Sequence, residues 1–65
     1  MKIIVNGEPA QTLAGTLADL LNELDLADAM VATAVNGAMV RKAKRGETAI
    51  SDGDRVEILA PMQGG

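Results

Sequence analysis

The stretch TLADLLNELD, residues 16–25, decides the fold of this 65-residue chain. Its leucines recur three, four and seven residues after the first, a spacing that places all of them on one stripe of a helix. Thr16 can cap the first turn with its hydroxyl, with Asp19 in the position that Glu or Gln fills in a capping box. We therefore expect a helix from about Leu17 to Asp25, whose apolar stripe must pack against a second layer.

Short β-type segments precede this helix. Residues 1–5 form a β-branched run that ends at Asn6-Gly7, a pair suited to the positive φ angles of a tight hairpin turn. Residues 10–14 are the expected return strand, and Pro9 places the start of that strand at an edge or in a turn because proline has no N–H. The sequence thus predicts one hairpin before the helix.

Three more strands are expected after the helix. Residues 30–35 and 38–40 flank a second Asn-Gly pair and form a second hairpin. Residues 55–60 form the last strand, with Val56 and Ile58 on the same face. This last strand can pair parallel to the first one, since the helix supplies the crossover between the hairpins.

The order β-β-α-β-β-β predicts an α+β domain of two layers, one sheet packed on one helix. A chain of this length has room for a single domain. We assign residues 1–60 to that domain and residues 61–65 to a flexible tail. Between the second hairpin and the last strand, the basic run 41–45 has two interpretations, of which a solvated loop is more common than a docking patch for an acidic partner.

The composition excludes several classes of function. The chain has no Cys, His, Phe, Tyr or Trp, so it lacks a thiolate or imidazole for catalysis and an aromatic ring to stack on nucleic acid bases. Its net charge of −3 opposes binding to phosphate backbones, and its apolar runs are too short to cross a bilayer. We expect a cytoplasmic protein that is not an enzyme, holds no metal or cofactor, and binds neither nucleic acid nor membrane.

The sequence ends in Pro61-Met62-Gln63-Gly64-Gly65. The two glycines have no side chain to pack and have the highest conformational freedom of any residue. This segment is therefore expected to project as a loose strip that ends in a carboxylate, which a narrow channel in a partner could admit.

Several short motifs occur in order along the whole chain. They are IIVNG at residues 3–7, TLADLL at 16–21, AVNG at 34–37 followed by Val40-Arg41, DGDRVEI at 52–58, and the terminal Gly64-Gly65. Together they resemble the small sulfur carrier proteins of thiamine biosynthesis (ThiS-like), a family of the ubiquitin-like superfamily. The resemblance implies a β-grasp fold, with a mixed sheet of four to five strands packed on one main helix.

The same resemblance implies that the chain is a co-substrate on which other proteins act. An E1-like adenylyltransferase (ThiF-like) would use ATP to adenylate the carboxylate of Gly65, and a sulfur donor such as a cysteine desulfurase would supply the sulfur of a thiocarboxylate. A thiazole synthase (ThiG-like) would then build that sulfur into a thiazole ring. The family resemblance thus assigns the adenylation and thiocarboxylate chemistry to Gly65.

Further candidate residues surround this terminus. Gly64, Gln63 and Met62 are expected to enter the active site of a partner together with Gly65. A possible partner-contact surface consists of Val40, Arg41, Ile58 and Leu59. Its three apolar residues are candidates only if they lie on the face of the sheet that points away from the helix.

Three other functions remain open from the sequence. The surroundings of Pro61 resemble the small subunit of molybdopterin synthase, a related sulfur carrier, although the length of the chain favours the thiamine branch. A ubiquitin-like modifier would use the same glycines to form isopeptide bonds with lysines. A pure binding module would carry an inert tail.

Overall fold

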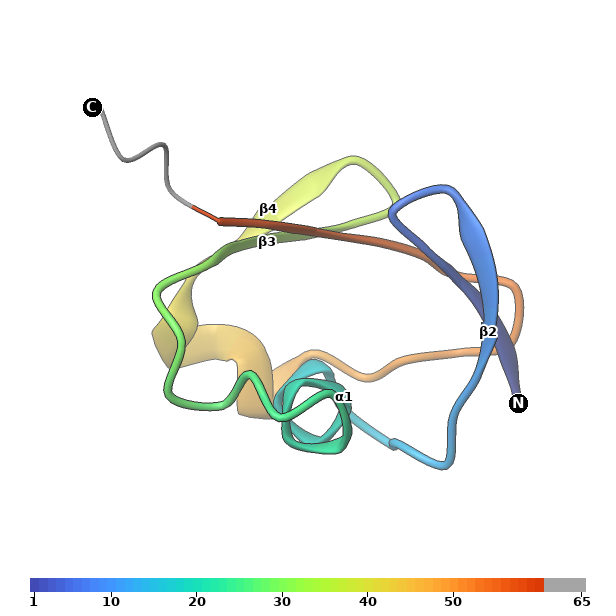
Figure 1. Cartoon of the computed structure of the whole chain (residues 1–65), viewed down its shortest axis with the longest axis horizontal. Helices are drawn as coiled ribbons and strands as arrows, with labels where there is room; N and C mark the ends of the chain where they lie inside the picture. Colours follow the sequence, from blue (N-terminus) through green and yellow to red (C-terminus); the bar gives the residue numbers. More distant parts are fainter. Residues whose placement is uncertain (61–65) are drawn as a thin grey trace.

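The computed structural model describes residues 1–60, in which a curved sheet lies over one α-helix (Figure 1). The elements in chain order are β1 (Lys2–Val5), β2 (Glu8–Gln11), α1 (Leu17–Glu23), β3 (Ala32–Val35), β4 (Ala38–Val40), the 3₁₀-helix η1 (Lys42–Glu47) and β5 (Arg55–Leu59). The predicted α+β class and the predicted order of strands and helix are confirmed, and η1 is an addition to them.

Helix α1 begins as the sequence predicts. The Thr16 hydroxyl accepts a hydrogen bond from the Asp19 backbone N–H at 3.1 Å, which satisfies one of the free donors of the first turn. Leu17, Leu20 and Leu21 are buried on one stripe of the helix. Within residues 1–60, no helix has the length and apolar character needed to cross a bilayer.

The end of α1 differs from the prediction, because the helix stops at Glu23 and Leu24 is exposed. Asp25 takes a positive φ of 61°, and its N–H donates to the Asn22 carbonyl, while the Leu26 N–H donates to the Leu21 carbonyl at 2.7 Å. These two bonds form a Schellman cap, which reverses the chain and brings Leu26 onto the core in place of Leu24.

Both Asn-Gly pairs form the tight turns that the sequence predicts. Asn6 and Gly7 have φ angles of 51° and 82°, and Asn36 and Gly37 have 50° and 85°. Two consecutive positive φ angles define a type I′ turn, whose twist matches that of the strands it joins. Each turn therefore closes a two-residue hairpin, β1–β2 and β3–β4.

Strand β2 lies two residues earlier than the predicted strand at 10–14. The two-residue turn makes Val5 and Glu8 the first hydrogen-bonded pair of the hairpin. Because hydrogen-bonded and non-hydrogen-bonded pairs alternate along an antiparallel ladder, the next pair, Ile4 and Pro9, requires no N–H from proline. The Thr12 N–H still donates to the Met1 carbonyl at 2.9 Å, and beyond it the backbone turns, with the Thr12 hydroxyl accepting the Ala14 N–H at 2.9 Å. Proline is thus inside the strand, on an edge of the sheet.

The sheet order is β2-β1-β5-β3-β4. Strand β5 pairs parallel with β1 and antiparallel with β3, which confirms the predicted parallel pairing of the first and last strands. Strand β5 ends at Leu59, one residue before the predicted end. The last strand of the chain is therefore the central strand of a mixed sheet.

The core lies between the helix and one face of the sheet. It consists of Ile3, Ala14, Leu17, Leu20, Leu21, Ile50, Val56 and Ile58. Ile50 lies in an irregular segment that a single bridge between Thr16 and Ala49 ties to the start of α1. The opposite face of the sheet has no helix over it among residues 1–60 (Figure 1).

Candidate functional site

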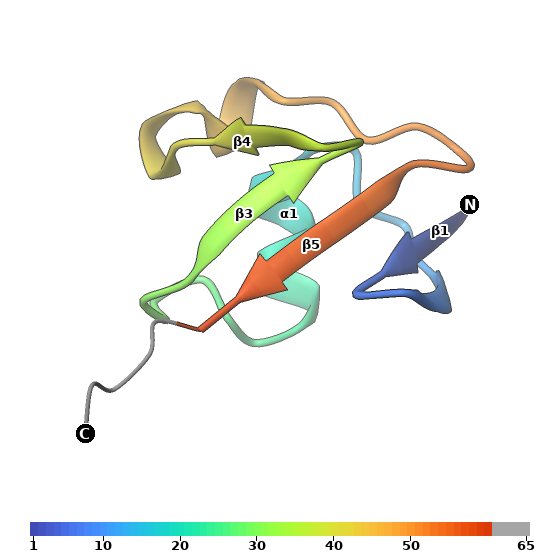
Figure 2. The same cartoon turned by 90° about the horizontal axis from the view of Figure 1, so that it is seen from above.

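The carboxyl end of β5 is the part of the described fold from which the chain continues toward the candidate residues at its terminus. Figure 2 shows β5 between β1 and β3, running away from the N-terminal end of the molecule. Gly65, Gly64, Gln63 and Met62 lie outside the described residues. The site that the structure describes is therefore the surface around Leu59 and Ala60.

Asn6 holds this end of β5 in register. Its side-chain Oδ1 accepts the Ile58 N–H at 2.8 Å, and its Nδ2 donates to the Ile58 carbonyl at 3.0 Å. The amide thus acts as an additional rung of the sheet ladder beyond the point where β1 ends. The asparagine that tolerates the positive φ of the turn also anchors the strand two residues before Ala60.

Asn36 holds the other end of β5 from the opposite side. Its Oδ1 accepts the Arg55 N–H at 2.9 Å, and its Nδ2 donates to Asp54 Oδ1 at 3.0 Å. This bond from Asn36, together with the Ser51 N–H on Asp54 Oδ2, lowers the pKa of the Asp54 carboxyl below its ordinary value. The two hairpin turns thus hold β5 from its first residue to Ile58.

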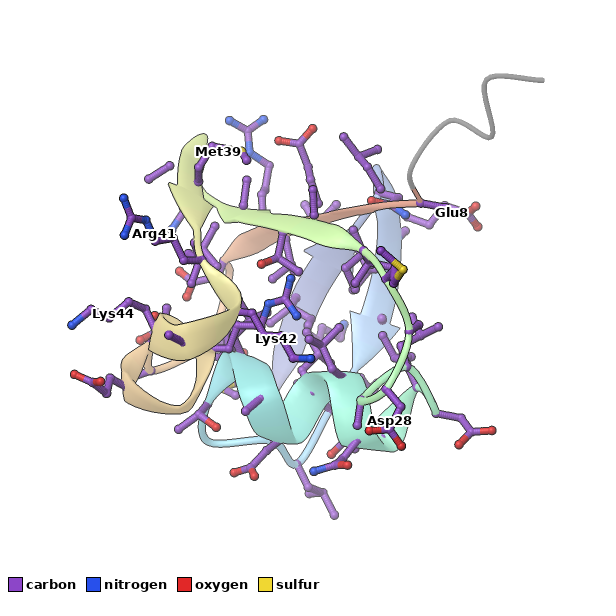
Figure 3. All side chains as sticks on the ribbon, turned by 90° about the vertical axis from the view of Figure 1, so that its left-hand side faces the viewer. Glu8, Asp28, Met39, Arg41, Lys42 and Lys44 are labelled. Atoms are coloured by element: carbon purple, nitrogen blue, oxygen red, sulfur yellow. The ribbon has the colours of Figure 1, made fainter. Side chains whose placement is uncertain are left out.

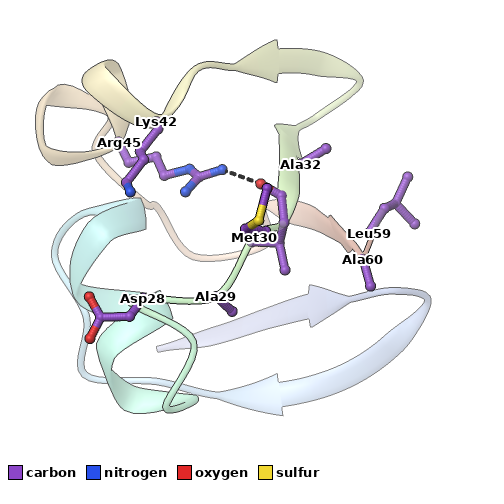
Figure 4. Close-up of a pocket in the computed structure, with 9 residues that line it drawn as sticks. Asp28, Ala29, Met30, Ala32, Lys42, Arg45, Leu59 and Ala60 are labelled. Atoms are coloured by element: carbon purple, nitrogen blue, oxygen red, sulfur yellow. Dashed lines mark hydrogen bonds between the residues drawn. The ribbon is translucent and has the colours of Figure 1, made fainter. Parts of the chain in front are cut away.

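A groove of about 430 Å³ lies beside the end of β5 (Figure 4). Leu59 and Ala60 form one side of it, Met30 lies in its middle, and Lys42 and Arg45 extend from η1 on the other side. The Met30 side chain is 83% exposed and that of Leu59 is 60% exposed. The groove therefore offers apolar contacts with the exposed cation of Lys42 at one rim, an arrangement that suits contact with another protein.

Arg45 shapes this groove from within the fold. Its Nε donates to the Thr33 hydroxyl at 3.0 Å, and its Nη2 donates to the Val31 carbonyl at 2.6 Å. The Thr33 hydroxyl in turn donates to the Val40 carbonyl at 2.8 Å. The Val31 carbonyl thus bonds to the guanidinium, and β3 begins at Ala32, which pairs with Leu59 at the end of β5, and not at the predicted residue 30.

The prediction of a solvated loop at residues 41–45 is wrong for Arg45, which is buried. Its neighbours Arg41, Lys42 and Lys44 are exposed, as that prediction expects. No local signal separates Arg45 from them, because its partners Thr33 and Val31 are more than ten residues earlier in the chain. The role of Met30 as a lining residue was also missed, since it was assigned to a strand.

The four residues predicted as a partner-contact surface divide between the two faces of the sheet. Leu59 is exposed on the face away from the helix, and Arg41 is exposed at the start of η1. Ile58 is buried in the core, and Val40 packs against the core. Of the three apolar candidates, Leu59 alone meets the condition of facing away from the helix.

Among the described residues, no group of three or more His, Cys, Asp or Glu side chains could hold a metal ion. The groove combines apolar carbon with basic side chains and the carboxylate of Asp28, a combination that suits contact with another protein.

Solved structures match this fold across its whole length. A crystal structure of a thiamine biosynthesis protein (ThiS) from Geobacter metallireducens superimposes with a TM-score of 0.83 at 35% identity, covering 100% of both chains. A solution NMR structure of a thiamine biosynthesis protein from the same organism gives a TM-score of 0.79 at 32% identity, covering 100% of this chain and 88% of the other. These matches confirm the predicted β-grasp fold.

A thiazole synthase from Paramagnetospirillum magneticum is 38% identical to this chain over 66 aligned positions. The alignment covers 100% of this chain and 20% of that protein, so the chain spans about a fifth of the length of this relative. The model of the ThiS family matches residues 3–65. The resemblance found in the sequence is thus confirmed, and the chain belongs to the ThiS family.

Proposed function

We propose that this chain is a sulfur carrier of thiamine biosynthesis, in which the Gly65 carboxylate is adenylated, converted to a thiocarboxylate and used as the sulfur source for a thiazole ring. The observation that carries the proposal is the match to the ThiS family, which extends from residue 3 through both terminal glycines. Membership in that family supports the role of a thiamine sulfur carrier and not that of a catalyst.

The proposed chemistry accounts for a carrier without cysteine. A carboxylate is a poor acyl donor until one oxygen becomes part of a good leaving group. The Gly65 carboxylate attacks the α-phosphate of ATP and releases pyrophosphate, which gives an acyl-adenylate. Sulfur at the oxidation level of sulfide then attacks the acyl carbon and displaces AMP. The product holds a nucleophilic sulfur on carbon without any thiol of the protein.

Three partners follow from this cycle. An E1-like adenylyltransferase would bind ATP and activate Gly65. A donor such as a cysteine desulfurase would provide the sulfur as a persulfide, and a thiol reductant, which is oxidised to a disulfide, would bring it to the sulfide level. A thiazole synthase would consume it, and the relative from P. magneticum that bears this name supports such a partner. Leu59 and Ala60 line the groove, so a partner bound there would contact the residues directly before the tail.

The proposal is tested by intact mass spectrometry of the purified chain after incubation with ATP, the adenylyltransferase and a sulfur donor. Replacement of one carboxylate oxygen by sulfur through the activated acyl group adds about 16 Da. The matched control is a chain that lacks Gly65, which we expect to fold and to gain no mass.

Absence of the mass increase with an adenylyltransferase that modifies its own carrier would contradict the proposal. Conjugates of the chain with other proteins on a denaturing gel would instead support the ubiquitin-like modifier. A thiocarboxylate that a molybdopterin synthase large subunit uses, and a thiazole synthase does not, would move the chain to the molybdopterin branch.

A further inference from the structure

The charge of this molecule is concentrated in one short segment. Residues 41–47 carry four cations and one acid, whereas the rest of the chain carries two cations and eight acids. A protein with a net charge of −3 thus has one strongly basic region. Because opposite charges on two partners orient their encounter, such a separation favours the approach of this region to an acidic surface.

Three of the four cations are available to a partner. Arg41 and Lys44 project outward from the start and the middle of η1, and Lys42 lies beside the groove (Figure 3). The fourth cation, Arg45, is buried and bonded within the fold. The Lys44 ammonium lies 3.8 Å from a Glu47 carboxylate oxygen, but both side chains are more than 60% exposed, so this pair contributes little stability.

The basic segment is continuous with exposed apolar surface. Lys42 and the side chains of Met30 and Leu59 line the same groove of about 430 Å³. Asp28 lies on the rim near α1, so the groove has one cationic and one anionic edge (Figure 4). A hollow of this size accepts an apolar side chain, which a phosphate backbone does not provide.

Resting on the proposed function, we infer that Lys42 and the groove form the docking surface for a thiazole synthase, through an acidic patch of that enzyme that also inserts an apolar side chain between Met30 and Leu59. The basic segment steers the approach and fixes the orientation, and the apolar contact slows dissociation. The occupant is a protein because the surface combines cations with an apolar hollow.

The choice of thiazole synthase has its own support. In the protein from P. magneticum, a sequence 38% identical to the whole of this chain makes up 20% of a thiazole synthase. The other four fifths of that protein are covalently attached to the ThiS-like sequence, and a covalent link holds two domains at a high effective concentration. This link supports a direct contact between a ThiS-like domain and thiazole synthase.

The test measures binding of the chain to purified thiazole synthase of the same organism by isothermal titration calorimetry. Lys42→Glu removes a cation of the docking surface, and Lys2→Glu makes the same change at an exposed position near the opposite end of the sheet (Figure 2). We expect Kd to rise about tenfold or more for Lys42→Glu and less than about twofold for Lys2→Glu. Lys42→Gln should give an intermediate value.

Salt provides a second measurement. Raising NaCl from about 50 to about 300 mM should weaken binding of the wild-type chain, because partly exposed charges are screened over shorter distances. Lys42→Glu should reduce this dependence on salt, and Lys2→Glu should not. Circular dichroism and thermal unfolding confirm that each variant is folded.

Each result supports or overturns the inference. Equal effects of Lys42→Glu and Lys2→Glu overturn it while the sulfur carrier function stands, because the mass increase at Gly65 is measured separately. A wild-type chain that gains sulfur and does not bind thiazole synthase overturns the choice of partner. Binding to a DNA duplex or to phosphatidylserine vesicles that Lys42→Glu abolishes, without an effect on the enzyme, assigns the basic segment to another ligand and overturns the inference.

Discussion

The two faces of the sheet are built from the same strands but have different roles. On the face toward the helix, Val56 and Ile58 of β5 are 1% and 8% exposed. On the opposite face, Leu59 of the same strand is 60% exposed and Met39 of β4 is 76% exposed. Alternate residues of one strand thus belong either to the core or to open surface.

This difference separates stability from recognition. The covered face packs against α1 and contributes most of the apolar burial. Because the core of so small a domain has few residues, each substitution there removes a large share of the stability. On the open face, Met39, Glu57 and Leu59 line a shallow hollow of about 230 Å³. Exposed side chains such as Met39 and Leu59 can change with little effect on folding, so this face and the adjoining groove are free to specify partners.

The largest expected effect is a substitution on the covered side. Leu17 has no exposed surface, so Leu17→Ala leaves a cavity between α1 and the sheet. We expect the free energy of unfolding to fall by about 2–5 kcal/mol, measured by urea denaturation. Leu13→Ala is the matched control, since Leu13 is 95% exposed. Similar losses for the two variants would contradict the division between core and surface.

The next effect concerns Arg45, which connects η1 to β3. Arg45→Met keeps most of the volume of the side chain but leaves the Val31 carbonyl and the Thr33 hydroxyl without this donor. We expect a loss of about 1–3 kcal/mol in the free energy of unfolding. Lys44→Met, at an exposed position of the same helix, should change it by less than about 0.5 kcal/mol. If Arg45→Met and Lys44→Met have the same free energy of unfolding, the hydrogen bonds of Arg45 do not stabilise the fold.

Arg45 also illustrates which parts of the structure the sequence predicts. Local patterns predicted the leucine stripe, the Thr16 cap and both Asn-Gly turns, because each depends on residues within a few positions of one another. The role of Arg45 depends on Thr33, a neighbour in space whose position follows from the register of the sheet. The sequence of a basic run does not predict which of its side chains is buried.

The boundaries of elements were missed for similar reasons. Leu24 continues the stripe by spacing alone, yet a Schellman cap at Asp25 gives its place to Leu26. The resemblance to a family predicted the fold, which the solved structures confirm, and it is the source of the chemistry proposed for Gly65, which geometry alone would not suggest. The groove beside Leu59 could not be predicted, since residues from three separate segments line it.

A smaller effect is expected at the turn that anchors β5. Asn6→Asp keeps a residue that tolerates a positive φ and keeps an acceptor, but it loses the Nδ2 donor to the Ile58 carbonyl. We expect the free energy of unfolding to fall by about 1 kcal/mol in urea at pH 7. Gln11→Glu, the same chemical change at an exposed position on the edge strand, is the control. Equal stability of the two variants would mean that the Asn6 amide does not hold β5.

The dependence of stability on pH tests the opposite anchor of β5. The Asn36 side chain and the Ser51 N–H lower the pKa of Asp54 in the folded state, so the ionised form stabilises the fold. This contribution is complete above the ordinary pKa of Asp, and it disappears as the pH falls through the lower pKa of the folded state. We expect a decrease in the thermal midpoint below about pH 4 that is smaller in Asp54→Asn. Glu8→Gln should keep the wild-type decrease, and an unchanged profile in Asp54→Asn would contradict the assignment.

The smallest effect on stability is expected on the open face. Leu59→Ser should change the free energy of unfolding by less than about 0.5 kcal/mol, because its side chain is largely in solvent already. Ile58→Ser, at the preceding residue of the same strand, is the control and should lose several times more because that side chain is buried. If Leu59→Ser is as unstable as Ile58→Ser, the open face belongs to the packing of the fold. If Leu59→Ser is stable and its binding to thiazole synthase is weakened, the strand that ends at the groove contributes one residue to folding and the next to recognition.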